Sequence, residues 1–164
     1  EYSIFNISGK HNDIIKSVTY SDDFCMLKLR GPGIGIKHGV LAKVTSALDR
    51  QRINIKSVIT SQITINLLLS RNDISKAYKL INGLNLRTVK EIIAMDNISV
   101  IAVVGEGLLE KEGIAARLFG AVARKKINIE IISLGASHVV SYFIVDKKDR
   151  KEAIQEIHEE FFNT

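Results

Sequence analysis

The first half of the chain contains stretches with two different apolar periods. Apolar residues occupy every second position at 25, 27 and 29, and again at 63, 65, 67 and 69. This period of two predicts half-buried β-strands. Between the two stretches, Val40, Val44, Ala47 and Leu48 follow the spacing of one helix face. A β-branched run at 55–59 predicts one further strand.

A second helix and a last strand complete the pattern of the first half. Ile74, Ala77, Tyr78 and Ile81 share one helical face. Asn72 or Asp73 stands where a residue caps a helix. A candidate strand follows near residues 86–93. The predicted order is β-α-β-β-α-β, which is the ferredoxin-like arrangement.

The second half of the chain repeats the first. A shift of 74 residues pairs Gly31 with Gly105, Gly33 with Gly107, Lys37 with Lys111, Gly39 with Gly113, Arg50 with Arg124, and Ile53, Asn54 and Ile55 with Ile127, Asn128 and Ile129. Later the shift becomes 76, as in Asp73 and Asp149. The second copy therefore gains two residues near 135–138, where a hairpin loop tolerates an insertion.

The second copy predicts the same elements except the last strand. A uniformly apolar strand at 99–104 precedes a helix with Ile114, Leu118, Ala121 and Val122 on one face, and Asp149 precedes a last helix with Ala153, Ile154, Ile157 and Phe161. Residues 14–20 alternate apolar and polar, so we predict that they supply the missing strand. The first copy would then be inserted within the second. We expect an α+β protein with antiparallel sheets, helices on one face, a connector at 1–23 and modules at 24–94 and 95–164.

Composition narrows the functional classes. The chain has 164 residues, a net charge of +5 and a single cysteine, Cys25. No apolar run approaches the roughly 20 residues of a membrane helix, and no signal peptide is visible. One cysteine excludes an internal disulfide and favours a reducing, cytoplasmic setting. We therefore expect no membrane partner.

Two other classes remain as alternatives at this point. RNA-recognition modules share the β-α-β-β-α-β order, but they stack bases on strand aromatics. Here aromatic residues make up 6% of the chain and the basic residues are dispersed, so we expect no nucleic-acid partner. Enzymes with a phosphate loop carry a full glycine motif with GK[ST], which Gly31, Gly33 and Gly35 do not form. His38 and His138 are solitary.

Several runs resemble the regulatory regions of aspartokinases, which carry tandem ACT domains. VITSQITINLLL at 58–69 and SLGASHVVSYFIV at 133–145 are similar to segments of the two repeats, closest to the lysine-sensitive type. HEEFF at 158–162 resembles the usual C-terminal ending of the family, and GVLAKVTSAL and GIAARLFGAV resemble its helix openings. The resemblance covers about residues 24–164. A regulatory ACT pair from another amino-acid enzyme is the alternative.

The resemblance implies a function. In that family, the ACT pair binds an end-product amino acid and inhibits phosphorylation of aspartate, giving feedback control in lysine, threonine and methionine biosynthesis. The KFGG-type motif of the kinase domain is absent here. The resemblance therefore implies no catalysis and no cofactor or metal for this stretch, with ATP and Mg²⁺ used only by the kinase domain. It also implies a homodimer formed through the ACT modules.

The same resemblance assigns the effector site. The matching positions are Ile34, Lys37, His38, Gly39, Val40, Leu41, Asn54, Ile55, Lys56, Thr60, Ser61 and Gln62. A helix beginning near Gly39 directs unpaired N–H groups at an amino acid's carboxylate. Other interpretations stay open, because Val40, Leu41 and Ile55 also suit a core, and Thr60 and Ser61 also suit a strand end. The repeated asparagine also suits a turn.

Two of these positions bear on the effector's identity. Lysine-sensitive relatives carry acids where Lys56 and Gln62 stand. Two like charges about 4 Å apart repel by roughly 4 kcal/mol at an effective dielectric of 20, which equals a millimolar affinity of about 4 kcal/mol. Lysine and threonine are therefore both candidate effectors. The second repeat, with Lys111, Glu112 and Glu130, is either a structural partner or a second site.

Overall fold

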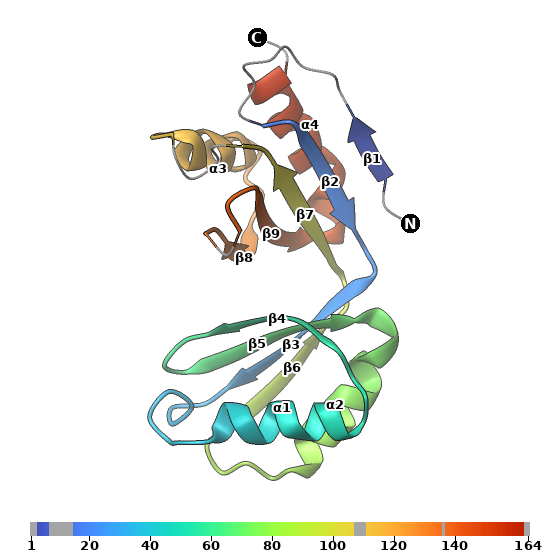
Figure 1. Cartoon of the computed structure of the whole chain (residues 1–164), viewed down its shortest axis with the longest axis vertical. Helices are drawn as coiled ribbons and strands as arrows, with labels where there is room; N and C mark the ends of the chain where they lie inside the picture. Colours follow the sequence, from blue (N-terminus) through green and yellow to red (C-terminus); the bar gives the residue numbers. More distant parts are fainter. Residues whose placement is uncertain (1–2, 7–14, 107–110, 136, 163–164) are drawn as a thin grey trace. The chain divides into compact units, whose positions relative to one another are not determined.

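The computed structural model describes the chain except for residues 1–2, 7–14, 107–110, 136 and 163–164. It divides into two compact units, one built from Glu1–Asp22 with Ile98–Thr164 and the other from Asp23–Asn97. We call these unit 1 and unit 2. In the described residues, each unit has one sheet and two α-helices, α1 and α2 in unit 2 and α3 and α4 in unit 1 (Figure 1).

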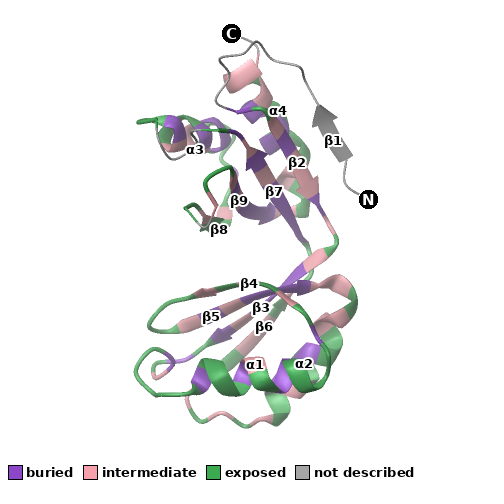
Figure 2. Cartoon of the chain, viewed as in Figure 1, coloured by how far each residue is buried: buried purple, intermediate pink, exposed green. Residues whose placement is uncertain are grey.

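Unit 2 contains the first repeat. Its elements are β3 (Phe24–Arg30), α1 (Val40–Arg50), β4 (Ile55–Thr60), β5 (Thr64–Ser70), the 3₁₀ turn η1 (Arg71–Asp73), α2 (Ile74–Gly83) and β6 (Glu91–Met95). The antiparallel sheet has the order β4-β5-β3-β6. Both helices pack on one face, where Leu27, Val44 and Leu67 are buried in one apolar cluster. Figure 2 shows that the exposed sides of α1 and α2 lie away from this cluster.

Unit 1 contains the second repeat together with the N-terminal strands. Its elements are β1 (Ser3–Asn6), β2 (Ser17–Ser21), β7 (Ile98–Val104), α3 (Ile114–Arg124), β8 (Ile129–Ser133), β9 (Val140–Asp146), the 3₁₀ turn η2 (Lys147–Asp149) and α4 (Arg150–Phe162). The sheet order is β1-β2-β7-β9-β8. β2 pairs antiparallel with β7, with Val18 beside Val103. Of the predicted strand at 14–20, Ile14 lies outside the described residues.

The repeat extends to backbone geometry. Gly39 and Gly113, which precede α1 and α3, have φ angles of 76° and 81°. Arg52 and Lys126, which follow the same helices, have φ angles of 55° and 57°. Strands β4 and β8 both shift register after their first residue, at Ile55 and Ile129. These four positive φ angles fall at equivalent places in the two copies, which confirms the predicted duplication. The α+β class with antiparallel sheets is also confirmed.

Some local predictions were wrong. The strand expected near 86–93 begins only at Glu91, because residues 84–90 first cross beside the β3–α1 loop. Asp73 precedes α2, but its side chain makes no capping hydrogen bond. Tyr78, expected on the buried face, is 38% exposed. Ile63, expected in the strand, lies in the β4–β5 turn and is 54% exposed.

Candidate functional site

The β3–α1 loop, residues 31–39, lies against the β4–β5 turn. The Gly31 N–H donates to the Ile63 carbonyl at 2.9 Å, and the Gly35 N–H donates to the Gln62 carbonyl at 2.8 Å. A Cβ on Gly35 would stand 2.6 Å from the Cα of Gln62, so only glycine permits this approach. Two segments of the predicted effector site therefore meet at one edge of unit 2.

The start of α1 provides N–H groups beside this loop. Gly39 holds the N-cap position, and no side chain caps the helix there. The first backbone bond of the helix runs from the Lys43 N–H to the Gly39 carbonyl at 3.0 Å. The N–H groups of a helix's first turn have no intrahelical acceptor, and the helix dipole favours an anion beside them. Exposed Lys37 and His38 immediately precede this helix start.

The hydroxyl of Ser61 already has a structural role. It lies 2.8 Å from the Thr64 hydroxyl and accepts the backbone N–H groups of Ile63 and Thr64 at 3.3 and 3.1 Å. These bonds hold the tight turn between β4 and β5. In a single copy of the chain, the contacts of Ser61 therefore fit its interpretation as a residue that ends the strand.

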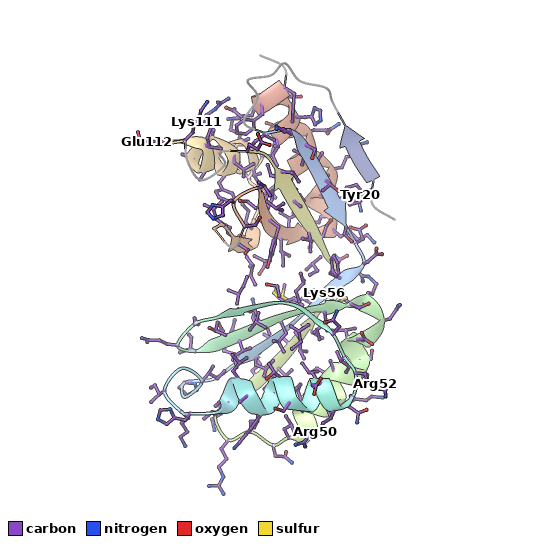
Figure 3. The ribbon with its side chains drawn as sticks, in the orientation of Figure 1. Tyr20, Arg50, Arg52, Lys56, Lys111 and Glu112 are labelled. Carbon is purple, nitrogen blue, oxygen red and sulfur yellow. The ribbon has the colours of Figure 1, made fainter. Side chains whose placement is uncertain are left out.

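The predicted effector residues fall into two groups. Lys37, His38, Gly39, Leu41, Thr60, Ser61 and Gln62 are exposed around the loop, the turn and the start of α1, while Ile34 and Val40 are buried beneath them. Asn54, Ile55 and Lys56 lie at the opposite end of β4 or just before it, four to six residue steps of about 3.3 Å from Thr60. Figure 3 labels Lys56 near that far end. One copy of unit 2 does not bring the two groups together.

Two equivalent positions of unit 1 carry acids, because Glu112 replaces His38 and Glu130 replaces Lys56, whereas Lys111 keeps the charge of Lys37. Lys111 and Glu112 are exposed before α3, and Figure 3 labels both there. Glu130, at the same register shift as Lys56, accepts a hydrogen bond from the Asn128 side chain at 3.1 Å. The repeated asparagine thus organises the start of β8 in this copy.

The pKa values of Asp22, Cys25, Lys125 and Glu160 are shifted, and the shifts of Asp22 and Cys25 arise from burial and contacts within the fold. Burial would raise the pKa of Asp22, but the hydrogen bond from Arg150 and the charges of Arg150 and Lys147 outweigh it, so the pKa is lowered. Burial raises the pKa of the Cys25 thiol, which lies within the sheet of unit 2. Neither group belongs to the predicted effector site.

A pocket that the sequence analysis missed lies on the helix side of unit 2. Its volume is about 630 Å³, and it is lined by α1 and by residues 84–88. Lys43 and Arg50 line it from positions seven residues apart, and seven residues are almost two helical turns. The spacing of Lys43 and Arg50 is visible in the sequence. The third cation, Arg87, joins them only in the folded structure.

Neither a metal-binding group of side chains nor a membrane-spanning helix is found among the described residues. Among them, no three His, Cys, Asp or Glu side chains gather into a group able to hold a metal ion. Across the same residues, no helix has the length and apolar character that a bilayer crossing requires.

Comparison with known proteins places both units in one family. Models of the ACT domain match residues 19–82 and 101–161. An aspartokinase of Candida albicans is 25% identical over 142 residues, which cover 87% of this chain and 26% of that protein. A bifunctional aspartokinase/homoserine dehydrogenase of Haemophilus influenzae is 28% identical over 156 residues, covering 91% of this chain and 19% of that protein. The chain thus spans about a quarter or less of the length of these relatives.

A solved structure has the same fold over nearly the same length. The ligand-free regulatory subunit of aspartate kinase from Thermus thermophilus superposes with a TM-score of 0.82 at 24% identity. The match covers 90% of this chain and 98% of that subunit. The chain belongs to the ACT-domain family, with one ACT domain in each unit. Within that family it is similar to the regulatory regions of aspartate kinases, including this separately solved subunit.

Proposed function

We propose that this region binds an end-product amino acid and thereby controls an aspartate kinase domain. The observation that carries the proposal is the uncapped start of α1, which faces an exposed loop bearing Lys37 and His38. An amino acid's carboxylate is the anion that such a helix start favours. Its ammonium group needs oxygen acceptors, and the exposed Thr60 and Gln62 lie on the adjoining turn.

We infer further that the effector is held between two copies of the chain. Ile36, Leu41, Val58 and Ile63 are exposed apolar side chains in the same segments as the effector residues, with exposures of 76, 39, 39 and 54%. Apolar side chains gathered around a polar site are typical of a surface that a partner covers. A second copy would also supply residues 54–56, which one copy holds at the far end of β4.

The insertion of the first module into the second belongs to the same proposal. It is supported by the pairing of β2 with β7 and by the division of unit 1 into segments before and after unit 2. The two modules would then be linked by two chain crossings, at Asp22 and at Asn97. Residues 1–23 would be both the connector from the kinase domain and part of the second module.

Threonine and lysine are the two effectors that the proposal distinguishes. Lys56 is exposed at the register shift of β4 and presents a positive charge where a lysine ligand needs a negative one. Threonine carries no side-chain charge and suits hydroxyl and amide partners. We therefore expect threonine to bind more tightly than lysine.

A melting-temperature screen tests the proposal. A ligand that binds only the folded state raises the midpoint as its concentration rises. Lysine, threonine, methionine and S-adenosylmethionine are each titrated, and sedimentation velocity reports the dimer. We expect one amino acid to raise the midpoint and to favour the dimer. A monomer with and without every amino acid would contradict the shared site.

The substitution Lys56→Asp tests the charge argument, with Lys79→Asp on the exposed face of α2 as its control. Both change the net charge equally. We expect Lys56→Asp to improve lysine binding relative to threonine binding, and Lys79→Asp to leave the ratio unchanged. An unchanged ratio in both variants would remove Lys56 from the site.

A further inference from the structure

The pocket on the helix side of unit 2 is strongly basic. Lys37, Lys43 and Arg50 line it from the start and length of α1, and Arg87 lines it from the opposite loop. His38 adds a fifth basic side chain, and no aspartate or glutamate is among the lining residues. Figure 3 labels Arg50 at the end of α1. A concave surface lined by one sign of charge concentrates its field and attracts the opposite charge.

In unit 1, an acidic side chain lies beside the basic residues that are equivalent to Lys43 and Arg50. The shift of 74 residues places Arg117 at the position of Lys43, and Arg124 at that of Arg50. The Glu160 carboxylate lies between them, with one oxygen 2.9 Å from Arg117 Nε and the other 2.9 Å from Arg124 Nη2. A carboxylate from α4 therefore bridges the two cations of α3.

Unit 2 has the cations but lacks this carboxylate. The shift of 76 residues places Leu84 at the position of Glu160, and Leu84 lines the pocket. Within the described residues, no ion pair joins Lys43, Arg50 or Arg87 to an acid. The acid that neutralises the pair in one repeat is thus replaced in the other by a leucine and an additional arginine.

The charge and shape of the pocket indicate a chemical class. Guanidinium groups such as those of Arg50 and Arg87 bind phosphate and carboxylate in a bidentate manner. A phosphate monoester carries about −1.5 to −2 at neutral pH, which suits several cations better than the single charge of a carboxylate. Val40, Ala47, Leu84 and Leu86 add apolar surface to the lining. The volume of about 630 Å³ lies within the roughly 300–1,000 Å³ of small-molecule sites.

We propose that this pocket binds a phosphorylated small molecule of nucleotide size. Its phosphate lies between Arg50, Lys43 and Arg87, in the place that Glu160 takes in unit 1, and its organic part lies on the apolar lining. The site adds a second ligand to the region and goes beyond the amino-acid effector. Lys37, His38 and Val40 border both sites, so the two ligands are expected to influence each other.

Isothermal titration of the whole chain at low salt tests the proposal, with ADP as the main probe. AMP, pyrophosphate and inorganic phosphate separate the contributions of the organic part and the phosphates, and succinate represents a carboxylate dianion. We expect ADP to bind more tightly than pyrophosphate, and both to bind more tightly than succinate. Raising the salt concentration weakens all of these interactions.

Three variants locate the site. Arg50→Glu should weaken ADP binding by roughly ten-fold or more, because it reverses a charge that contacts the phosphate. Lys79→Glu changes the net charge equally on α2 outside the pocket lining, and its affinity should match that of the unchanged chain. Leu84→Glu supplies the carboxylate that unit 1 has, and it should abolish ADP binding. Far-ultraviolet circular dichroism melts establish that each variant is folded.

The outcomes are distinct. No binding of any phosphate probe, or an equal loss with Arg50→Glu and Lys79→Glu, would overturn the proposal. Succinate binding as tightly as ADP would overturn the assignment to phosphate. Pyrophosphate binding as tightly as ADP would overturn the role of the organic part. The amino-acid screen is read separately, so failure of this site leaves the effector site standing, and the reverse also holds.

Discussion

The two repeats share a backbone and differ in how they treat the same surface. Both place a helix after a glycine of positive φ, and both bury apolar residues at equivalent positions of that helix. In unit 1, the basic residues of α3 form ion pairs with Glu156 and Glu160 of α4. In unit 2, the equivalent residues of α1 line an open pocket. The duplicated core constrains buried positions tightly, whereas exposed charges are free to diverge.

The ion pairs of unit 1 show how far this divergence goes. Glu156 is only 7% exposed, although it is a carboxylate. Its oxygens lie 3.8 Å from Arg124 Nε and 3.2 Å from Lys125 Nζ, so its charge is compensated. The pKa of Glu160 is lowered by hydrogen bonds from Arg117 and Arg124. The same Glu156 carboxylate, through a hydrogen bond and its charge, raises the pKa of Lys125.

The largest expected effect comes from truncating a buried side chain in one of the two separate apolar cores. Leu27 and Ile101 are equivalent, and both side chains are 0% exposed. Leu27→Ala should lower the free energy of unfolding by roughly 2–5 kcal/mol. The loss should be confined to unit 2, since the two apolar clusters share no residue.

Hydrogen exchange measured by mass spectrometry checks this expectation. Amides of β3 and β5 should exchange faster in Leu27→Ala, and amides of β7 and β9 should not. Ile101→Ala should give the reverse pattern. Equal loss of protection in both units would mean that the repeats fold as one cooperative body.

The next effect concerns the loop that shapes the basic pocket. A Cβ on Gly31 would stand 1.8 Å from the Thr88 carbonyl oxygen, so Gly31→Ala must displace residues 84–90. We expect a loss of roughly 1–3 kcal/mol in the free energy of unfolding, together with weaker ADP binding. Urea denaturation and titration measure the two changes.

Gly83→Ala is the matched control. An added Cβ at Gly83 meets nothing within 4 Å, and the residue closes α2. It should leave the stability unchanged or raise it by up to about 1 kcal/mol. If Gly31→Ala proved equally harmless, the close approach of Thr88 would not be what positions the loop.

A smaller effect is expected when equivalent arginines on the charged surfaces of the two repeats are replaced and compared. Arg124→Ala removes a cation that lies near two carboxylates, and it should lower the unfolding midpoint. Arg50→Ala removes a cation that lines a pocket together with other basic side chains, and it should leave the midpoint unchanged or raise it slightly. Thermal melts of both variants in low and high salt compare them. Equal losses would contradict the difference proposed between the two surfaces.

The smallest effect is a dependence on pH that belongs to unit 1. Asp22 forms ion pairs with Arg150 and with Lys147, the latter at 3.4 Å. Because its pKa is lower in the folded state than in the unfolded chain, its contribution is complete above the unfolded value of about 4. That contribution is lost as the pH falls through the folded-state pKa.

Asp22→Asn tests this dependence. At neutral pH the variant should be less stable by about 1 kcal/mol or less. The difference from the unchanged chain should shrink in acid. Denaturant midpoints measured from neutral to acidic pH give the comparison. A constant difference across that range would mean that the charge of Asp22 contributes nothing.

Sequence periodicity was sufficient for most of the fold. The buried faces of α1 and α3 were predicted at Val44 and Leu118, and the shift of 74 residues matched the positive φ angles of Gly39 and Gly113. Apolar spacing determines these features locally, so a single sequence contains them. The late start of β6 depends on contacts that residues 84–90 make with the β3–α1 segment, and no local pattern records those.

The candidate site was only partly accessible from the sequence. The family resemblance assigned the loop and the turn to one site, but the close backbone approach at Gly35 was not predicted from the sequence. The separation of Lys56 from Thr60 follows from the length of β4, which the β-branched run at 55–59 predicted to within one residue, whereas the register shift at Ile55 was not predicted. The basic pocket is lined by Arg50 and Arg87, which belong to different elements. Their proximity depends on the tertiary fold and leaves no periodic pattern in the sequence.

The split of unit 1 around unit 2 has a consequence for synthesis of the chain. β2 leaves the ribosome before any of unit 2, whereas its partner β7 follows only after Asn97. A folded unit 2 brings β3 beside β6 and so brings the ends of its own segment together, with Met26 paired to Met95. Folding of unit 2 thus shortens the loop that β2 and β7 must close, which lowers the entropic cost of their pairing. A nascent chain halted before Ile98 would carry a folded unit 2 and a β2 strand that is not yet paired with β7.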